Sequence, residues 1–259
     1  MNNRIVIIPT FNEIENIKAI IEKVLSLEPH FNVLIVDDGS PDGTGNAVQL
    51  IQNENPSRVY LIERKGKMGL GTAYIAGFKW AIENQYDFIF EMDADFSHNP
   101  KDLIRLFYAC ARPEELKNEN IEPEKAQAAD MSIGSRYING VNVVNWPIDR
   151  VLMSYFAGFY VRFITGMPIQ DATAGFVCYR KKVLETIPLD QIKFIGYAFQ
   201  VEMKFTTWKY KFNILEVPII FTDRTKGTSK MSANIFKEAI FGVIQLKINS
   251  LFNRYQRAS

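Results

Sequence analysis

The stretch Arg4-Ile5-Val6-Ile7-Ile8 is a short apolar run of the kind that forms a central strand of a parallel sheet. Residues 13–27 follow it with the spacing of one helix face, carried by Ile14, Ile17, Ile20, Ile21 and Val24. Together the two segments predict a strand followed by a helix, which is the repeating unit of a doubly wound sheet.

The same alternation continues along the chain. Further strands are predicted at residues 33–36, 59–62, 86–92 and 130–135, and around Cys178, with helices at residues 44–52 and 70–83 and from about Lys101. We therefore expect an α/β fold with a mostly parallel sheet flanked by helices. In such folds ligands bind beyond the carboxyl ends of the strands.

Length and composition narrow the class of protein. The 259 residues suit one α/β domain with a large core, and a formal charge of +1 argues against nucleic acid as a partner. Cys110 and Cys178 form no metal-binding spacing, so we expect buried free thiols in a reducing compartment. No apolar run approaches the roughly 18 residues of a spanning helix, and the sequence predicts neither a signal peptide nor an integral membrane protein.

Asp93 and Asp95 follow the predicted strand at residues 86–92. Residues two apart on an extended chain point to the same side, so both carboxylates are expected to face one point. Two such groups repel unless a cation lies between them, and hard oxygen ligands suit Mg²⁺ or Mn²⁺ with a diphosphate. The alternative is that they cap the helix that begins near Lys101.

The common nucleotide-binding motifs are missing. The turn at residues 9–13 contains no glycine, and the glycines at residues 66–71 have the wrong order for a dinucleotide motif or a P-loop. These glycines either let backbone amides approach a phosphate beside Lys67 or pack a helix closely on the sheet.

The second half contains one charged and one aromatic segment. We expect residues 112–125 to be a solvated loop or a short exposed helix, without chemistry. Residues 151–165 are apolar almost all round, which suits a core helix or a membrane interface. Arg150 and Ser154 lie one turn apart, where they would either hold a phosphate or cap and pack a helix.

Five ordered motifs resemble those of the polyprenol-phosphate (dolichol-phosphate) mannosyltransferases, members of the family-2 inverting glycosyltransferases. The motifs are Pro9-Thr-Phe11-Asn-Glu13, Val36-Asp37-Asp38-Gly-Ser-Pro-Asp42-Gly, Asp93-Ala94-Asp95-Phe-Ser97-His98, Gly134-Ser-Arg136-Tyr137 and the segment from Arg224 to Lys230. The resemblance spans about residues 4 to 235. It implies a GT-A (Rossmann-like) fold and transfer of mannose from GDP-mannose to a polyprenyl or dolichyl phosphate.

The resemblance also implies roles for individual residues. Catalytic roles fall on Asp93, Asp95, Arg136 and Arg224, and acceptor-phosphate binding falls on Arg136, Arg150 and Ser154. The metal, Mg or Mn, would be held by Asp93, Asp95 and Ser97. The nucleotide-sugar site would comprise Pro9, Phe11, Glu13, Val36, Asp37, Asp38, Asp42, Lys67, Asp93, Ala94, Asp95, Arg224 and Lys230. Two positions depart from the family: Phe11 replaces a frequent tyrosine, and Ser97 replaces a glutamine ligand of some relatives.

The implied mechanism is a single inverting displacement. A phosphate monoester, whose second pKa is about 6, is largely a dianion at neutral pH and needs no strong base, so Glu202 is expected to be structural. Alternatives are sugar transfer from a UDP-sugar, or a non-catalytic binding module or subunit of a membrane complex.

Residues 1–232 are expected to form the catalytic domain and residues 233–259 an amphipathic helix. This helix either packs on the domain or on a membrane-protein subunit, or joins residues 151–165 in contact with the membrane surface. The expected location is the cytoplasmic face of a membrane, bound peripherally.

Overall fold

The protein, seen in a computed structural model, is built on one seven-stranded sheet with the order β3-β2-β1-β4-β7-β5-β8. The structure describes residues 3–196, 198–223, 233–252 and 255–256, and in the last helix it describes side chains from Phe241. The strands are β1 (Arg4–Thr10), β2 (Asn32–Asp37), β3 (Val59–Glu63), β4 (Phe88–Glu91), β5 (Met131–Ser135), β7 (Val177–Arg180) and β8 (Ile214–Pro218). A separate parallel pair consists of β6 (Val143–Val144) and β9 (Phe221–Thr222).

The strand directions confirm the predicted α/β class. β7 runs antiparallel to its neighbours β4 and β5, and every other adjacent pair in the large sheet is parallel. The carboxyl ends of β1, β2, β4, β5 and β8 therefore lie along one edge of the sheet. This edge collects the polar residues that follow each strand.

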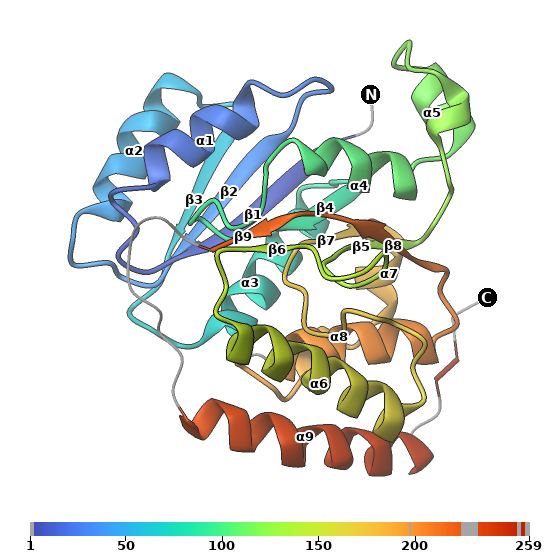
Figure 1. The fold of residues 1–259 in the computed structure, drawn as a ribbon. Coiled ribbons are helices and arrows are strands. Elements are labelled where there is room, and N and C mark those ends of the chain that lie inside the picture. The colour runs from blue at the N-terminus through green and yellow to red at the C-terminus, as the bar shows by residue number, and fades with distance from the viewer. Residues whose placement is uncertain (1–2, 197, 224–232, 253–254, 257–259) are drawn as a thin grey trace.

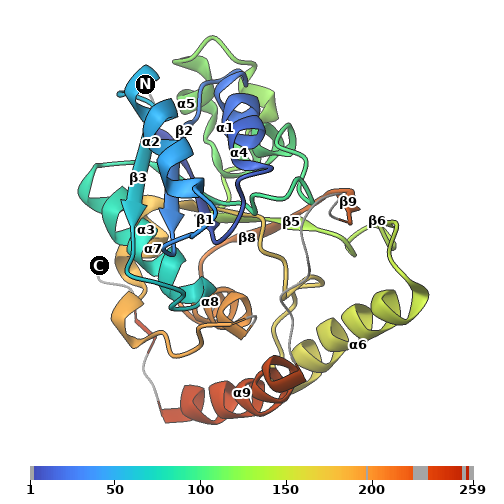
Figure 2. The ribbon, with the colours of Figure 1, turned by 90° about the vertical axis from the view of Figure 1, so that its left-hand side faces the viewer.

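Helices cover both faces of the sheet, as Figure 1 shows. Apolar side chains of α1 (Ile17–Leu25), α2 (Thr44–Glu54) and α4 (Asp102–Cys110) pack on one face. Those of α3 (Leu70–Glu83), α7 (Lys181–Thr186) and α8 (Ala198–Lys209) pack on the other. Beyond α8, α6 (Ile148–Thr165) and α9 (Ala233–Phe252) contact each other in an outer layer, which Figures 1 and 2 both show.

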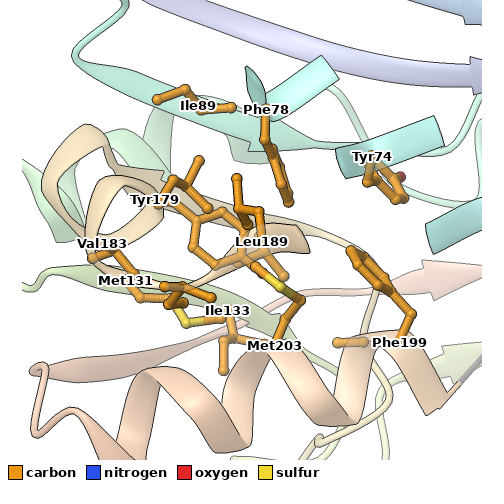
Figure 3. Close-up of a cluster of buried hydrophobic side chains, with 14 of the residues drawn as sticks. Tyr74, Phe78, Ile89, Met131, Ile133, Tyr179, Val183, Leu189, Phe199 and Met203 are labelled. Atoms are coloured by element: carbon orange, nitrogen blue, oxygen red, sulfur yellow. The ribbon is translucent and has the colours of Figure 1, made fainter. Parts of the chain in front are cut away.

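Aromatic and sulfur-containing side chains fill the core between α3, β7 and α8 (Figure 3). Tyr74 and Phe199 stack with ring centroids 6.0 Å apart, and Phe78 meets Tyr179 edge to face at 5.4 Å. A Cβ on Gly71 would lie 2.7 Å from the Phe199 ring, so this glycine lets α3 approach α8 closely. Burial of each large side chain contributes about 1.5–3 kcal/mol to the free energy of folding. The close approach of α3 and α8 allows the Tyr74 and Phe199 rings to meet.

Two predictions about local structure were wrong in part. Residues 112–125 form the helix α5 (Pro113–Lys117) and a 3-10 turn, but they are docked and not merely solvated, because Leu116 is buried and Glu119 pairs with the buried Arg4 at 2.8 Å. The helix predicted from residue 13 begins at Ile17. Residues 13–16 are instead held in a turn by backbone hydrogen bonds to the carbonyl of Glu13.

The outer layer exposes apolar side chains. Within the described parts of the chain, no helix has both the length and the apolar character needed to span a bilayer. α9 packs inward through Val243 and Leu246, and the Lys247 ammonium donates to the Thr165 carbonyl at 3.0 Å. The exposed apolar residues of the two helices are Ile148, Leu152, Met153, Tyr155, Phe156, Phe159 and Phe163 on α6, and Phe241, Ile244, Ile248, Leu251 and Phe252 on α9.

Candidate active site

The segment after β2 is fixed by the Asp37 carboxylate, which lies at the carboxyl edge of the sheet. The Thr10 hydroxyl donates to Asp37 Oδ1 at 2.7 Å, and Ser40 donates to the same carboxylate through its hydroxyl at 2.6 Å and its backbone amide at 2.9 Å. Asp37 is 2% exposed. Its two oxygens are therefore engaged in holding the β1 and β2 ends together, and Val36 beside it packs in the core.

Asp42 ties the loop after β1 to the start of α2. Its carboxylate accepts from the Thr44 hydroxyl at 2.6 Å and the Thr44 amide at 3.0 Å, and from the Ile14 amide at 3.1 Å. Burial alone would raise the pKa of Asp42, but these hydrogen bonds hold it below its usual value. Asp42 thus shapes the loop that carries Phe11 and Glu13.

Asp38 pairs with Arg64, a residue that the sequence analysis did not single out. Arg64 Nε donates to Asp38 Oδ1 at 2.6 Å, and Arg64 also donates to the Thr72 hydroxyl at 2.8 Å. Arg64 directly follows β3, so its position at the carboxyl edge was the signal that could have identified it. The pair joins the β2 and β3 ends beneath the segment that carries Lys67.

Lys67 and Phe11 are brought together from segments more than fifty residues apart in the sequence. The Lys67 ammonium lies 5.4 Å from the Phe11 ring centroid, within cation–π range. Gly66 has a φ of 144° and Gly69 a φ of 100°, which favour glycine in this loop. The fold thus brings together Phe11 and Lys67, two of the residues predicted for the nucleotide site, and Pro9 nearby in the chain is half-buried.

Asp93 and Asp95 lie at the edge, but not on an extended strand as predicted. β4 ends at Glu91, and Asp95 lies in a turn in which it accepts from the Ser97 amide at 3.1 Å. Neither aspartate caps α4, because its N-cap residue is Lys101 and no side chain caps it. The capping alternative is therefore wrong.

The oxygen groups around this turn fit a divalent cation with open coordination positions. Asp95 is buried, the Asp93 side chain is 41% exposed, and Ala94 between them is buried. The buried Ser97 hydroxyl has no hydrogen-bond partner among the described residues. Across those residues no cluster of three or more His, Cys, Asp or Glu side chains is suited to a metal. A cation here would need further oxygen ligands from water or a substrate, which is usual for Mg²⁺.

His98 closes the back of the turn. Its ring stacks on Phe176 with centroids 4.8 Å apart, and its Nδ1 lies 3.5 Å from the Asp93 amide. Burial lowers the pKa of His98 to about 4. The imidazole is therefore neutral at pH 7, which leaves Nδ1 able to accept a hydrogen bond from that amide.

Arg136 follows β5 and is held by Asp171. Its Nε and one terminal nitrogen donate to the two Asp171 oxygens at 2.7 and 2.6 Å, and the same terminal nitrogen donates to Thr173 at 2.9 Å. Burial alone would raise the pKa of Asp171, but the Arg136 charge and hydrogen bonds hold it below its usual value. The ion pair fixes the direction of the guanidinium.

Arg150 and Arg136 both contact the ring of Trp146. Arg150 donates to Asp223 at 2.9 Å and lies 4.1 Å from the Trp146 ring centroid, and Arg136 lies 5.6 Å from the same ring. Ser154 is half-buried one turn further along α6. The structure thus brings Arg136 and Arg150 together, while the predicted Arg224 and Lys230 lie outside the described residues.

A buried polar chain lies in the core on the α8 side. The Lys204 ammonium donates to the Ala174 carbonyl at 2.6 Å and to the Gln200 amide oxygen at 3.0 Å, and Gln200 donates to Glu91 at 2.9 Å. Burial raises the pKa of Glu91 to about 8 and lowers that of Lys204 to about 8. Glu202 of the same helix accepts from the amides of residues 193 and 194, which is the expected structural role.

One cavity at the surface does not belong to this site. It has a volume of about 720 Å³ and opens near Arg4 and Tyr108. These residues lie toward the amino ends of the strands, and Arg4 is already paired with Glu119 there. The chemistry-bearing residues instead gather at the carboxyl edge.

The carboxyl edge of the sheet carries both acidic and basic side chains. Two carboxylates follow β4, together with the Ser97 hydroxyl, which has no hydrogen-bond partner in the described part of the chain. Arg136 follows β5, and Arg150 lies in the first turn of α6. Such a site can bind a metal-bound diphosphate beside a second phosphate, which is the requirement of a transferase that joins a nucleotide-linked group to a phosphate.

Comparison with known proteins agrees with this class. The profile described as glycosyl transferase family 2 matches residues 5–116. A polyprenol monophosphomannose synthase of Mycolicibacterium smegmatis is 42% identical over 250 residues, covering 96% of this chain and 89% of that protein. An undecaprenyl-phosphate mannosyltransferase of Micrococcus luteus is 43% identical over 237 residues, covering 92% and 90%.

The chain therefore belongs to glycosyltransferase family 2, and the predicted family and enzyme class are confirmed. A crystal structure of glucosyl-3-phosphoglycerate synthase from Mycobacterium tuberculosis, with Mn²⁺, UDP-glucose and phosphoglyceric acid, superimposes with a TM-score of 0.63. The two chains are 13% identical, and the match covers 98% of this chain and 81% of that one. This likeness supports the GT-A-like fold.

Proposed function

We propose that this protein transfers mannose from GDP-mannose to a polyprenyl phosphate, with inversion at the anomeric carbon. The observation that carries the proposal is that Asp93 and Asp95 follow β4 at the same sheet edge where Arg136 follows β5, with Arg136 and Arg150 sharing the Trp146 ring. Relatives above 40% identity, named as polyprenol-phosphate and undecaprenyl-phosphate mannosyltransferases, supply the substrate class.

The donor half would hold the diphosphate through a divalent cation. Asp93, Asp95 and Ser97 offer oxygen atoms, and a Mg²⁺ or Mn²⁺ ion would stabilise the negative charge of the departing GDP. Mn²⁺ accompanies UDP-glucose in the glucosyl-3-phosphoglycerate synthase structure, which has the same fold. Lys67 and Phe11 would contact the nucleotide, and Arg224 and Lys230 would complete the diphosphate site.

The acceptor half would place the lipid phosphate against Arg136, Arg150 and Ser154. Charge-assisted hydrogen bonds from two arginines fix both the position and the orientation of a phosphate. Because the phosphate is largely a dianion at pH 7, it can attack the anomeric carbon without a general base. Positioning and electrostatic stabilisation then supply the rate enhancement.

The outer layer of α6 and α9 would bring the site to the lipid. Twelve large apolar side chains of these helices are at least 39% exposed, and the two helices contact each other on the far side of α8 from the sheet (Figures 1 and 2). A surface of this kind suits the boundary between lipid headgroups and acyl chains. We infer peripheral binding to the cytoplasmic face of a membrane.

A product assay tests the proposed reaction. Purified protein is incubated with MnCl₂ or MgCl₂, a short polyprenyl phosphate, and GDP-mannose, GDP-glucose, UDP-glucose or UDP-galactose in separate reactions. We expect one polyprenyl phosphate hexose by mass spectrometry, from GDP-mannose only. If a product forms only from a UDP-sugar, the donor is not GDP-mannose. If no donor gives a lipid product, the proposed function is wrong.

Vesicle binding tests the membrane surface. Phe159→Ser and Phe163→Ser, combined on the exposed face of α6, are expected to reduce co-sedimentation with anionic vesicles at least about threefold. Leu50→Ser on α2 is the control, because Leu50 is also exposed but lies on the opposite side of the sheet. Equal binding of wild type and both variants would reject the assignment of this surface.

A further inference from the structure

Three aromatic side chains lie between the two halves of the site and have no role in the reaction proposed above. They are His98 of the turn after β4, Trp146 before α6 and Phe221 of β9. We refer to these three residues as the aromatic bridge. They come from distant parts of the chain, so their contact is a product of the fold.

Trp146 contacts both acceptor arginines. The guanidinium carbon of Arg150 lies 4.1 Å from the Trp146 ring centroid and that of Arg136 lies 5.6 Å from it. Two like charges that approach a common ligand repel each other, and the negative face of an indole offsets part of that repulsion. The ring is therefore a group that both cations share.

Phe221 joins this arginine pair to the turn that carries Asp93 and Asp95. Its ring centroid lies 5.3 Å from that of Trp146 and 5.2 Å from that of His98, and both contacts are edge to face. The Arg136 guanidinium lies 5.5 Å from the Phe221 ring. One side chain therefore touches a residue of each half.

Backbone hydrogen bonds of β9 also join the two halves of the site. The Thr222 amide donates to the Ser97 carbonyl at 3.2 Å, which ties β9 to the turn after β4. The Asp223 amide donates to the Val144 carbonyl at 3.0 Å, and the Asp223 carboxylate pairs with Arg150. A shift of β9 would thus move groups on both sides of the site.

We propose that Trp146 and Phe221 are positioning residues: Trp146 sets the spacing of the arginines that bind the acceptor phosphate, and Phe221 couples that spacing to the turn that binds the donor. The proposal rests on the function proposed above. It predicts that loss of the Trp146 ring harms acceptor binding alone, whereas loss of the Phe221 ring harms binding of both substrates.

The variants are chosen to separate positioning from stability. Trp146→Leu and Phe221→Leu remove each ring, and Trp146→Phe and Phe221→Tyr retain one. Trp80→Leu is the matched control, because Trp80 is also half-buried and in ring contact with two tyrosines but lies on α3, away from the site. Thermal unfolding of each variant shows whether it is folded at the assay temperature.

The readouts are the KM of a short polyprenyl phosphate, and the Kd of GDP in the presence of MnCl₂ by calorimetry. Trp146→Leu is expected to raise the acceptor KM about tenfold, the scale of one or two cation–π contacts, with an unchanged Kd for GDP. Phe221→Leu is expected to raise both values at least about threefold. The ring-retaining variants should stay within about twofold of wild type.

Each outcome decides a part of the proposal. If Trp146→Leu and Phe221→Leu behave like Trp80→Leu while the wild type makes product, the positioning roles are wrong and the proposed function stands. An effect of Phe221→Leu on the acceptor alone would overturn the coupling. A wild type that makes no lipid product would instead reject the underlying function.

Discussion

The two halves of the site are built in different ways. The donor half combines short local contacts, such as Ser40 with Asp37 and Thr44 with Asp42, which are three and two residues apart, with longer-range ones such as Thr10 with Asp37, which are 27 residues apart. The acceptor half depends on partners far apart in the chain, since Arg136 and Asp171 are separated by 35 residues and Arg150 and Asp223 by 73. Local contacts make a motif readable in sequence, whereas distant ion pairs appear only in the folded chain.

The first prediction concerns the buried ion pair of the acceptor half, which joins Arg136 and Asp171. Arg136→Ala leaves the Asp171 carboxylate, 1% exposed, without its principal cation, so we expect the free energy of unfolding to fall by about 3–5 kcal/mol. Arg150→Ala serves as the control, because the Arg150 side chain is 34% exposed and its pair should contribute less than about 1 kcal/mol. Urea unfolding measures both, and equal losses would contradict the difference in burial.

The second prediction concerns turnover in the donor half. Asp93→Asn and Asp95→Asn should each lower kcat at least about a hundredfold, the scale expected for lost electrostatic stabilisation of the leaving group. Folding should survive, because each change removes one of two like charges. Asp87→Asn, at the opposite end of β4, is the control.

The same assay should lose activity when EDTA removes divalent cations and regain it when MnCl₂ is added. Near wild-type turnover in either variant, or full activity in excess EDTA, would show that the aspartates hold no essential metal.

The third prediction sharpens the contact between Arg150 and Asp223. The Asp223 carboxylate pairs with the Arg150 guanidinium, which we assign to the acceptor phosphate. The carboxylate and the phosphate should therefore compete for Arg150. Asp223→Asn is expected to lower the acceptor KM about twofold to threefold. Glu216→Gln is not a suitable control, since Glu216 accepts from the Asp171 amide. Asp130→Asn, on the far side of β5, is suitable, and an acceptor KM raised by Asp223→Asn would contradict competition.

The fourth and smallest effect is a pH dependence of stability. The pKa of Lys204 is lowered to about 8 in the folded protein from 10.5, chiefly by burial. The unfolded chain then binds more protons than the folded one between these values, so stability rises with pH from about 8 to 10.5.

Wild type should therefore gain stability relative to Lys204→Met over this interval, by at most about 1.4 kcal/mol per pH unit. Urea unfolding at pH 8, 9 and 10 measures the difference between the two proteins. A difference that stays constant, or shrinks as the pH rises, would mean that the folded-state pKa of Lys204 is not depressed.

Much of the fold was predictable because the apolar runs and helix spacings are strong. The predicted boundaries of α3 agree with the structure, and those of β2 differ by one residue at each end. The turn at residues 13–16 was missed because it depends on Asp42 and Thr44, which are distant in sequence. The antiparallel direction of β7 follows from tertiary pairing and has no local signal.

The site also contains features that the sequence predicts and features that depend on distant contacts. Asp93, Asp95 and Arg136 were chosen from motifs, and all three lie at the sheet edge in the structure. Neither Arg64 nor the aromatic bridge was identified, since their contacts join segments that a linear pattern does not connect. The alternation argument for the two aspartates was wrong, because β4 ends two residues before Asp93.

Calorimetric titration of Asp95→Asn and Arg150→Ala with GDP-mannose plus MnCl₂, and separately with a short polyprenyl phosphate, tests most directly whether the site has two separate halves. We expect Asp95→Asn to weaken only donor binding and Arg150→Ala to weaken only acceptor binding, each about tenfold or more, because each removes a charge that faces one phosphate group. Equal weakening of both ligands by either variant would contradict two distinct halves that meet at one edge of the sheet.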